Sequence, residues 1–317
     1  MDVTDFKYSF DRLVWNVESV IKGRPEPVRL ALTCLLASGH LLIEDVPGVA
    51  KTSMAKAIAA SMVGGSFKRV QFTPDLLPSD VTGGQVFNLK DQAFEFVQGP
   101  VFCHVLLADE INRASPKTQS ALLQAMAEGE VTAGRDTYRL EPPFLCMATQ
   151  NPVEHHGTYP LPEAQLDRFM MRISMGGHPG PVAEKAILAW AVGGGHAVQL
   201  QPVLTVADVL DMMKVARSLH VGHALQSYIV EIIDRTRSNG DVQVGPSPRA
   251  TIALAVAAQA RAASLGRSFV SPDDVKALAV SVLAHRLVLT AEARVKKKSA
   301  ASIVWDITGS VSVPRRP

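Results

Sequence analysis

Lys51 and Thr52 stand where an apolar run and a tight turn lead into an amphipathic helical pattern. The backbone N–H groups of such a turn point inward, and the dipole of the following helix adds partial positive charge. Lys51 is then placed to reach the β- and γ-phosphates of a nucleotide, and the Thr52 hydroxyl to bind Mg²⁺. The segment expected to bind the nucleotide consists of Asp45, Val46, Pro47, Gly48, Val49, Ala50, Lys51, Thr52 and Ser53.

This turn departs from the usual phosphate-loop pattern, G-x-x-x-x-G-K-[ST]. Asp45 and Ala50 replace the two glycines, while Gly48 remains inside the turn. We expect Ala50 to avoid positive φ, which is possible if the helix has already begun there. An ordinary strand-to-helix turn with a surface lysine is the alternative at this point.

An acidic pair, Asp109 and Glu110, ends another apolar run. The ends of parallel strands face the ligand crevice of a sheet. Asp109 is expected to hold Mg²⁺, and Glu110 to orient and deprotonate a water aimed at the γ-phosphate. Asn151 follows a further apolar run, and its neutral amide can both donate and accept hydrogen bonds beside that water. The alternatives are a solvated acidic turn and, for Asn151, a turn residue before proline.

Two arginines are candidates for stabilising phosphate charge in a transition state. Arg168 lies just before an apolar run, and Arg249 lies at the start of an alanine-rich helical pattern. A correctly placed guanidinium raises the rate of phosphoryl transfer by about 10³ to 10⁵. From spacing alone, a structural ion pair at a helix end is the better interpretation of each.

Short apolar runs, separated by helical patterns, are expected to position these residues. Runs that are apolar on both faces predict a parallel sheet covered on both sides. One helix is expected to begin at Pro116 with Ser115 as its N-cap and to stop at Gly129. The five expected strands lie in residues 41–44, 67–72, 102–108, 144–149 and 169–173.

Two segments interrupt this alternation. Residues 74–100 suggest a β-hairpin inserted in a helix, and residues 130–140 suggest a second hairpin with a turn at Gly134. Glycine and proline at 176–181 mark a domain boundary, beyond which the chain has helical periodicity. We therefore expect a core over residues 1–178 and a helical domain with a C-terminal tail over residues 179–317.

Composition limits the class of protein. The 317 residues carry a net charge of +2, which argues against nucleic-acid binding driven by overall charge. Three unpaired cysteines, Cys34, Cys103 and Cys146, lie within apolar runs and indicate reduced, buried thiols. We see no secretory signal and no apolar run of the ~20 residues that a membrane helix needs. The expectation is a cytoplasmic protein without membrane insertion.

Taken in order, these segments resemble those of the AAA+ ATPases and, within them, the MoxR family. The resemblance covers most of the chain, and the block from Gly157 to Phe169 is its most specific part. The segments that carry it are Glu44–Thr52, Ala108–Ala114, Thr149–Pro152, Gly157–Phe169, Ser247–Ala250 and Val270–Val275.

The resemblance implies an α/β fold, in which an αβα nucleotide-binding core with a parallel five-stranded sheet precedes an all-helical lid. It implies ATP and Mg²⁺ as ligands and a homo-oligomer, typically a hexameric ring. Asn151 takes the sensor-one role and Arg168 that of an arginine finger acting on ATP of the neighbouring subunit. Arg249 matches sensor two and is expected to swing with the lid. Arg113 is a second candidate for contact across the subunit boundary.

The implied activity is ATP hydrolysis coupled to remodelling or maturation of protein clients, often beside partners with a von Willebrand factor A domain. His155 and His156 depart from the family pattern, and we interpret them as a surface loop. A nucleic-acid motor is an alternative, although Arg135, Asp136 and Arg139 give the second hairpin mixed charge. A subunit of a metal chelatase and a nucleotide-sensing scaffold without turnover are the others.

Overall fold

The computed structural model describes residues 1–46, 48–90, 92–151, 158–177, 180–192 and 200–314. Its centre is a five-stranded sheet in the order β10-β1-β9-β6-β3, with every neighbouring pair parallel. These strands are β1 (Leu41–Glu44), β3 (Phe67–Gln71), β6 (Val105–Asp109), β9 (Leu145–Gln150) and β10 (Met171–Ile173). The five predicted strands are confirmed, although the third begins at Val105 rather than at Phe102 and the fifth at Met171 rather than at Phe169.

Alternate residues of each strand enter two separate cores, because successive side chains of a strand point to opposite faces. Leu41 and Ile43 pack with one helical layer, while Leu42 packs with the other. The first layer consists of α1 (Val3–Val20), α2 (Pro25–Leu36) and α3 (Lys51–Ala60). The second consists of α5 (Pro116–Glu128) with the short α4 (Pro78–Thr82). The sheet is thus covered on both faces, as its apolar runs predict.

Helix α5 begins and ends where its caps were predicted. The Ser115 hydroxyl accepts a hydrogen bond from the Thr118 N–H, and Pro116 occupies the first helical position. Gly129 ends the helix with φ of 66°, a left-handed conformation that glycine adopts without steric cost.

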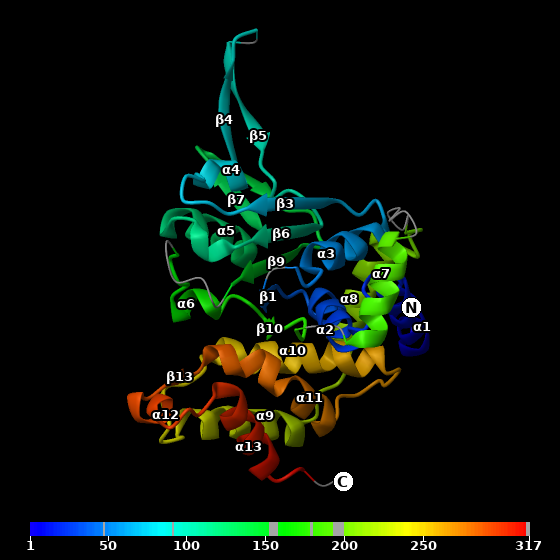
Figure 1. The fold of residues 1–317 in the computed structure, drawn as a ribbon, viewed down its shortest axis with the longest axis vertical. Helices are drawn as coiled ribbons and strands as arrows, with labels where there is room; N and C mark the ends of the chain where they lie inside the picture. The colour runs from blue at the N-terminus through cyan, green and yellow to red at the C-terminus, as the bar shows by residue number, and fades with distance from the viewer. Residues whose placement is uncertain (47, 91, 152–157, 178–179, 193–199, 315–317) are drawn as a thin grey trace.

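Two hairpins extend from the core (Figure 1). The first pairs β4 (Gly83–Asn88) with β5 (Ala93–Gln98), and the second pairs β7 (Glu130–Ala133) with β8 (Asp136–Arg139). Phe96 of the first stacks on Tyr138 of the second with ring centroids 4.0 Å apart. Both hairpins were expected, but the first is not inserted in a helix. It follows α4 and leads into the turns and bends of residues 99–104.

The C-terminal part of the chain is mostly helical. Its helices are α7 (Pro181–Val192), α8 (Val206–Ser218), α9 (His223–Arg237), α10 (Pro248–Ser264), α11 (Pro272–Leu283), α12 (Ala291–Val295) and α13 (Ala300–Ser310). The expectation of a wholly helical lid is wrong in detail. The strand β12 (Val242–Val244) pairs with β13 (Val288–Leu289), and β11 (Leu204–Thr205) pairs with β2 (Met62–Val63) of the core.

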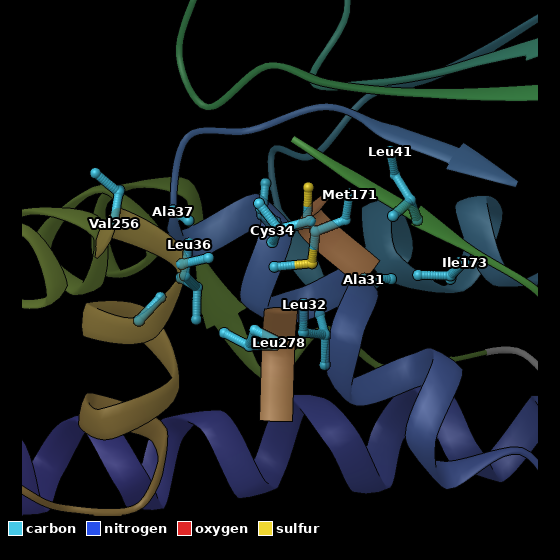
Figure 2. Packing of buried hydrophobic residues seen from close by; sticks show 14 of the residues in the cluster. Ala31, Leu32, Cys34, Leu36, Ala37, Leu41, Met171, Ile173, Val256 and Leu278 are labelled. Atoms are coloured by element: carbon cyan, nitrogen blue, oxygen red, sulfur yellow. The ribbon is translucent and has the colours of Figure 1, made fainter. Parts of the chain in front are cut away.

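Helix α10 joins the C-terminal helices to the sheet layer. Its alanines allow close approach on several sides, and it contacts α1, α2, α8, α9 and α11. Figure 2 shows side chains of α2, such as Leu32 and Cys34, between strand residues such as Met171 and Leu278 of α11. Because one continuous apolar cluster runs from β1 to α13, the placement of α10 relative to the sheet is fixed by packing.

Candidate functional site

The loops that follow β1, β6 and β9 meet at one edge of the sheet. Glu44 pairs with Gln150, so the segments after β1 and β9 leave the sheet side by side. Asp109 ends the neighbouring strand β6. This edge, which we call the carboxyl edge, therefore brings together the Lys51 loop, the acidic pair and Asn151, as the sequence predicts for parallel strands.

The Lys51 loop has left-handed backbone at two residues, Gly48 (φ 84°) and Ala50 (φ 64°). The expectation that Ala50 avoids positive φ is therefore wrong. The helix α3 begins at Lys51, one residue later than that expectation required, and Ala50 is its N-cap. A non-glycine residue in this conformation costs about 1–2 kcal/mol, so the loop holds strain at its junction with the helix. Pro47 lies outside the described residues.

The first turn of α3 provides the features that a phosphate site requires. The N–H groups of Lys51, Thr52 and Ser53 lie at a helix N-terminus, where an α-helix leaves its donors without intrahelical partners. A Cβ added to Gly48 would meet nothing within 4 Å, so the turn borders open space. This arrangement fits a phosphate group.

Lys51 is half-buried beside three carboxylates. Its Nζ donates to the Asp45 carbonyl oxygen at 3.0 Å. Burial lowers the pKa of Lys51, while Asp109, Asp45 and Glu110 oppose that shift. The ammonium group therefore lies among acidic groups that favour its charged form.

The Asp45 side chain contributes to the fold rather than to the open face of the loop. Its Oδ2 accepts hydrogen bonds from the Ser174 hydroxyl at 2.8 Å and from the Met175 N–H at 2.6 Å. Its Oδ1 accepts from the Val46 N–H at 3.1 Å. The carboxylate thus connects the end of β1 to the chain after β10. Val49 of the same loop is buried in the core.

Both oxygens of the Asp109 carboxylate already have partners. The Thr149 hydroxyl donates to Oδ1 at 2.7 Å, and Arg69 Nη2 donates to Oδ2 at 2.6 Å. Sequence reasoning assigned no role to Thr149 or Arg69. Thr149 could have been noticed, because it places a hydroxyl in an otherwise apolar strand that ends beside Asn151. Nothing in the sequence pattern pointed to Arg69.

Glu110 also has left-handed backbone, with φ of 56°. Its N–H donates to the Thr149 hydroxyl oxygen at 2.9 Å, so Thr149 links the two acidic residues. Its Oε2 accepts from Arg113 Nη1 at 2.9 Å. Arg113, expected at a subunit boundary, pairs in this structure with the acidic residue of its own chain. Asn151 directly follows β9.

Arg168 and Arg249 lie together at the opposite edge of the sheet, which we call the amino edge. They line a cavity of about 670 Å³ with residues 36–40, which precede β1, and with Met170, which precedes β10. The Arg168 Nη1 donates to the Leu123 carbonyl oxygen at 2.7 Å.

Arg249 therefore lies at the edge opposite to the Lys51 loop of its own chain. The start of α10 is held at the amino edge, where the Ser247 hydroxyl donates to Asp167 Oδ2 at 2.8 Å. β1 separates this edge from Lys51, because residues 36–40 precede that strand and residue 51 follows it.

A buried histidine also lies at the amino edge. The Cys146 N–H donates to His40 Nδ1 at 3.1 Å, so the proton of the neutral ring is on Nε2, which donates to the Met126 carbonyl oxygen at 2.9 Å. Burial lowers the pKa of His40 to about 4. The ring is therefore neutral near pH 7.

The donor set of the carboxyl edge suits Mg²⁺ bound together with phosphates. Thr52 and Asp109 supply oxygens, and Mg²⁺ prefers one or two protein ligands plus phosphate oxygens and water. Within the described ranges, no three His, Cys, Asp or Glu residues gather into a metal cage. His155 and His156 lie outside those ranges. No described helix has the length and apolar character needed to span a bilayer.

Comparisons with known proteins agree with this geometry. Residues 40–171 match the model of the "ATPase family associated with various cellular activities (AAA)", and residues 234–307 match that of the AAA lid domain. A crystal structure from Cytophaga hutchinsonii matches with a TM-score of 0.92 and 37% identity, covering 99% of this chain and 97% of that one.

Relatives in sequence agree as well. "Uncharacterized protein YeaC" of Bacillus subtilis is 47% identical, with 96% of this chain and 94% of the relative covered. "Chaperone MoxR1" of Mycobacterium tuberculosis is 40% identical, with 97% of this chain and 83% of the relative covered. "Protein MoxR" of Methylorubrum extorquens is 29% identical, with 98% and 95% covered. Sequence, fold and relatives together show that this chain belongs to the MoxR family of AAA+ ATPases.

Proposed function

We propose that this protein is a Mg²⁺-dependent ATPase whose active site is completed by a second copy of the chain. The observation that carries the proposal is the separation of the charged groups. Lys51, Asp109 and Glu110 lie at the carboxyl edge, and Arg168 and Arg249 lie at the amino edge. Since β1 separates the two edges, we infer that the arginines contact ATP bound to a neighbouring subunit. Repetition of this contact gives a closed ring, and we propose a hexamer.

In this proposal each residue has one task. The N–H groups before and within the first turn of α3, together with Lys51, bind the phosphates. Mg²⁺ held by Thr52 and Asp109 would neutralise phosphate charge. Glu110 leaves Arg113, orients the attacking water and accepts its proton, while Asn151 donates a hydrogen bond to water or phosphate. Arg168 and Arg249 of the neighbour stabilise charge on the transferring phosphoryl group.

We further propose that hydrolysis remodels protein clients in the cytoplasm. The first hairpin exposes Phe87, Leu89 and Phe94, with Phe94 69% and Leu89 83% exposed. Exposed apolar groups of this size suit protein partners rather than a phosphate backbone. The cysteines are buried and free, as in a reducing compartment. A partner with a von Willebrand factor A domain is the client class that the family resemblance suggests.

The test is ATP hydrolysis by the purified protein with Mg²⁺ over a range of protein concentrations. Activity per subunit should rise with concentration, because the site requires two copies. Lys51→Ala should neither bind nor hydrolyse ATP. Activity per subunit that stays constant down to a monomeric concentration would contradict the shared site.

A second experiment addresses the client. Glu110→Gln, held in its ATP-bound state, should retain clients during purification. Lys51→Ala is the matched control, since it cannot reach that state. Equal retention by both variants would contradict coupling of ATP to client binding. Stimulation of hydrolysis by DNA, with steep salt dependence, would instead favour a nucleic-acid motor.

A further inference from the structure

The Asp167 carboxylate joins three segments at the amino edge. Its Oδ1 accepts a hydrogen bond from Arg286 Nε at 2.7 Å, and its Oδ2 accepts from the Ser247 hydroxyl at 2.8 Å. Arg286 belongs to the 3-10 turn after α11, and Ser247 is the N-cap of α10. One side chain of the core thus contacts two elements of the C-terminal part.

Arg286 fixes the backbone on both sides of Arg168. Its Nη2 donates to the carbonyl oxygens of Asp167 at 3.1 Å and Phe169 at 2.7 Å. Its Nη1 donates to the carbonyl oxygens of Met170 and Val282. The Arg286 side chain is 3% exposed, so these bonds and the ion pair with Asp167 are shielded from water. The chain that carries Arg168 therefore has little freedom relative to residue 286.

Ser247 extends the same network to Arg249. Its hydroxyl oxygen accepts a hydrogen bond from the Arg249 N–H at 3.1 Å while it donates to Asp167. Asp167 is adjacent to Arg168, and Ser247 lies two residues before Arg249. The two arginines of the cavity are consequently linked through a single carboxylate.

We propose that Asp167 and Arg286 are positioning residues that hold Arg168 and Arg249 at a fixed separation, so that both enter the neighbouring nucleotide site as one unit. This inference rests on the proposed shared site. It differs from a lid that swings independently, because the start of α10 is bound to the sheet edge of its own chain. Neither Asp167 nor Arg286 is expected to touch ATP.

The first test is Asp167→Asn, which keeps the shape of the side chain and removes its charge. Displacement of catalytic groups by about 1 Å can cost 10²-fold in rate, so we expect kcat to fall by about that factor. Binding of Mg²⁺-ATP should be unchanged, because the Lys51 loop lies at the other edge. Ser247→Ala should give a smaller loss of the same kind. Asp211→Asn, which breaks an exposed pair with Lys214, is the matched control.

The second test separates positioning in trans from a general effect on the fold. Asp167→Asn is mixed with Lys51→Ala before assembly. In mixed oligomers, the intact Lys51 loop of an Asp167→Asn subunit can then meet the intact Arg168 and Arg249 of a Lys51→Ala subunit. The mixture should hydrolyse ATP well above the sum of the two separate variants. A mixture of Asp167→Asn with Arg168→Ala should show no gain in ATP hydrolysis, because both variants alter the amino edge and neither supplies intact arginines.

The outcomes distinguish the inference from the proposed function. If Lys51→Ala mixed with Arg168→Ala gains activity while Asp167→Asn mixed with Lys51→Ala does not, the positioning role is overturned and the shared site stands. If neither mixture gains activity, the shared site itself fails. Should Asp167→Asn not fold, as judged by its thermal transition and ATP binding, Ser247→Ala takes its place in the same mixtures. Full activity of Ser247→Ala would then overturn the inference.

Discussion

The two edges of the sheet hold their charged residues in different ways. At the carboxyl edge, Asp109 and Glu110 pair with Arg69 and Arg113, whose side chains are 47% and 45% exposed. At the amino edge, Asp167 pairs with an arginine that is 3% exposed. Exposed pairs contribute little stability, whereas breaking a buried pair is costly. The comparison suggests that the carboxyl edge rearranges when nucleotide arrives, while the amino edge keeps one geometry.

Left-handed backbone occurs at both edges. Ala50 and Glu110 at the carboxyl edge and Ser38 at the amino edge have positive φ without being glycine. The edges differ instead in their buried hydrogen bonds, because His40, His285 and Arg286 contact carbonyl oxygens from buried positions near the amino edge.

The largest expected effect is that of Arg168→Ala. We expect kcat to fall by about 10³ to 10⁵, because the variant lacks charge stabilisation of the phosphoryl group. ATP binding should be unchanged, since Arg168 lies away from the loop of its own chain. Steady-state hydrolysis and calorimetric titration check both. Arg235→Ala, at an exposed pair with Glu231, is the control. Loss of binding comparable to that of Lys51→Ala would contradict the separation of the edges.

Glu110→Gln tests the chemistry of the carboxyl edge. Loss of the proton acceptor should lower kcat by about 10² to 10⁴, while calorimetry shows retained Mg²⁺-ATP binding. Glu128→Gln, at the exposed end of α5, provides a control that should keep full activity. Undiminished hydrolysis by Glu110→Gln would mean that another group activates the water.

Acid should destabilise the protein through the buried histidines near the amino edge. Burial lowers the pKa of His40 to about 4 and that of His285 to about 3, below the ordinary value of 6.5. The unfolded chain then binds more protons, so stability is lost as pH falls below 6.5. Each histidine should remove on the order of 2 kcal/mol from the free energy of unfolding between pH 6.5 and 5.

Urea denaturation at several pH values measures this loss. His40→Gln should reduce the pH dependence by the share of one histidine. An identical pH dependence in His40→Gln and the unmodified protein would show that His40 does not titrate as the structure indicates.

Arg69→Gln removes the arginine that forms an ion pair with Asp109. In the proposed site, Mg²⁺ competes with Arg69 for this carboxylate, so removal of the Arg69 guanidinium should lower the Mg²⁺ concentration for half-maximal hydrolysis. A half-exposed pair is worth about 0.2–1 kcal/mol, which predicts a change of about 1.4-fold to fivefold. Arg235→Gln is the matched control. A higher Mg²⁺ requirement would mean instead that Arg69 orients Asp109 for the metal.

The smallest expected effect is that of Ala50→Gly. Glycine removes the steric cost of positive φ, and we expect the free energy of unfolding to rise by up to about 1 kcal/mol. Ala60→Gly, at the exposed end of the same helix, should lower it by about 0.5–1 kcal/mol. Thermal or urea unfolding compares the two. Destabilisation by both would show that the loop is not strained at Ala50.

The elements of the core were predictable because their signals are local. Apolar runs gave the five strands, and Ser115 with Gly129 gave the limits of α5. The acidic pair and the Lys51 loop could be placed together because parallel strands share an edge. The conformation of Ala50 was not predictable from its residue type, since the loop imposes a backbone that alanine alone disfavours.

The sequence pattern could not predict how segments that are distant in the sequence pack against one another. Arg249 was expected to swing with the lid, but its position at the amino edge depends on how α10 packs against α1, α2 and α8, which the sequence pattern does not show. Arg69 was missed because an arginine in a strand gives no sign of the carboxylate on the neighbouring strand. The division of the chain near residue 178 stays a prediction.

Mixing Lys51→Ala with Arg168→Ala before assembly tests the central claim most directly. The first variant lacks the lysine proposed to bind phosphate, and the second lacks the arginine proposed to act on the neighbouring ATP, so each alone should be inactive. The account predicts that the mixture regains ATP hydrolysis, because loops of the second variant meet arginines of the first. Lasting inactivity of a mixture shown to form mixed oligomers would contradict it.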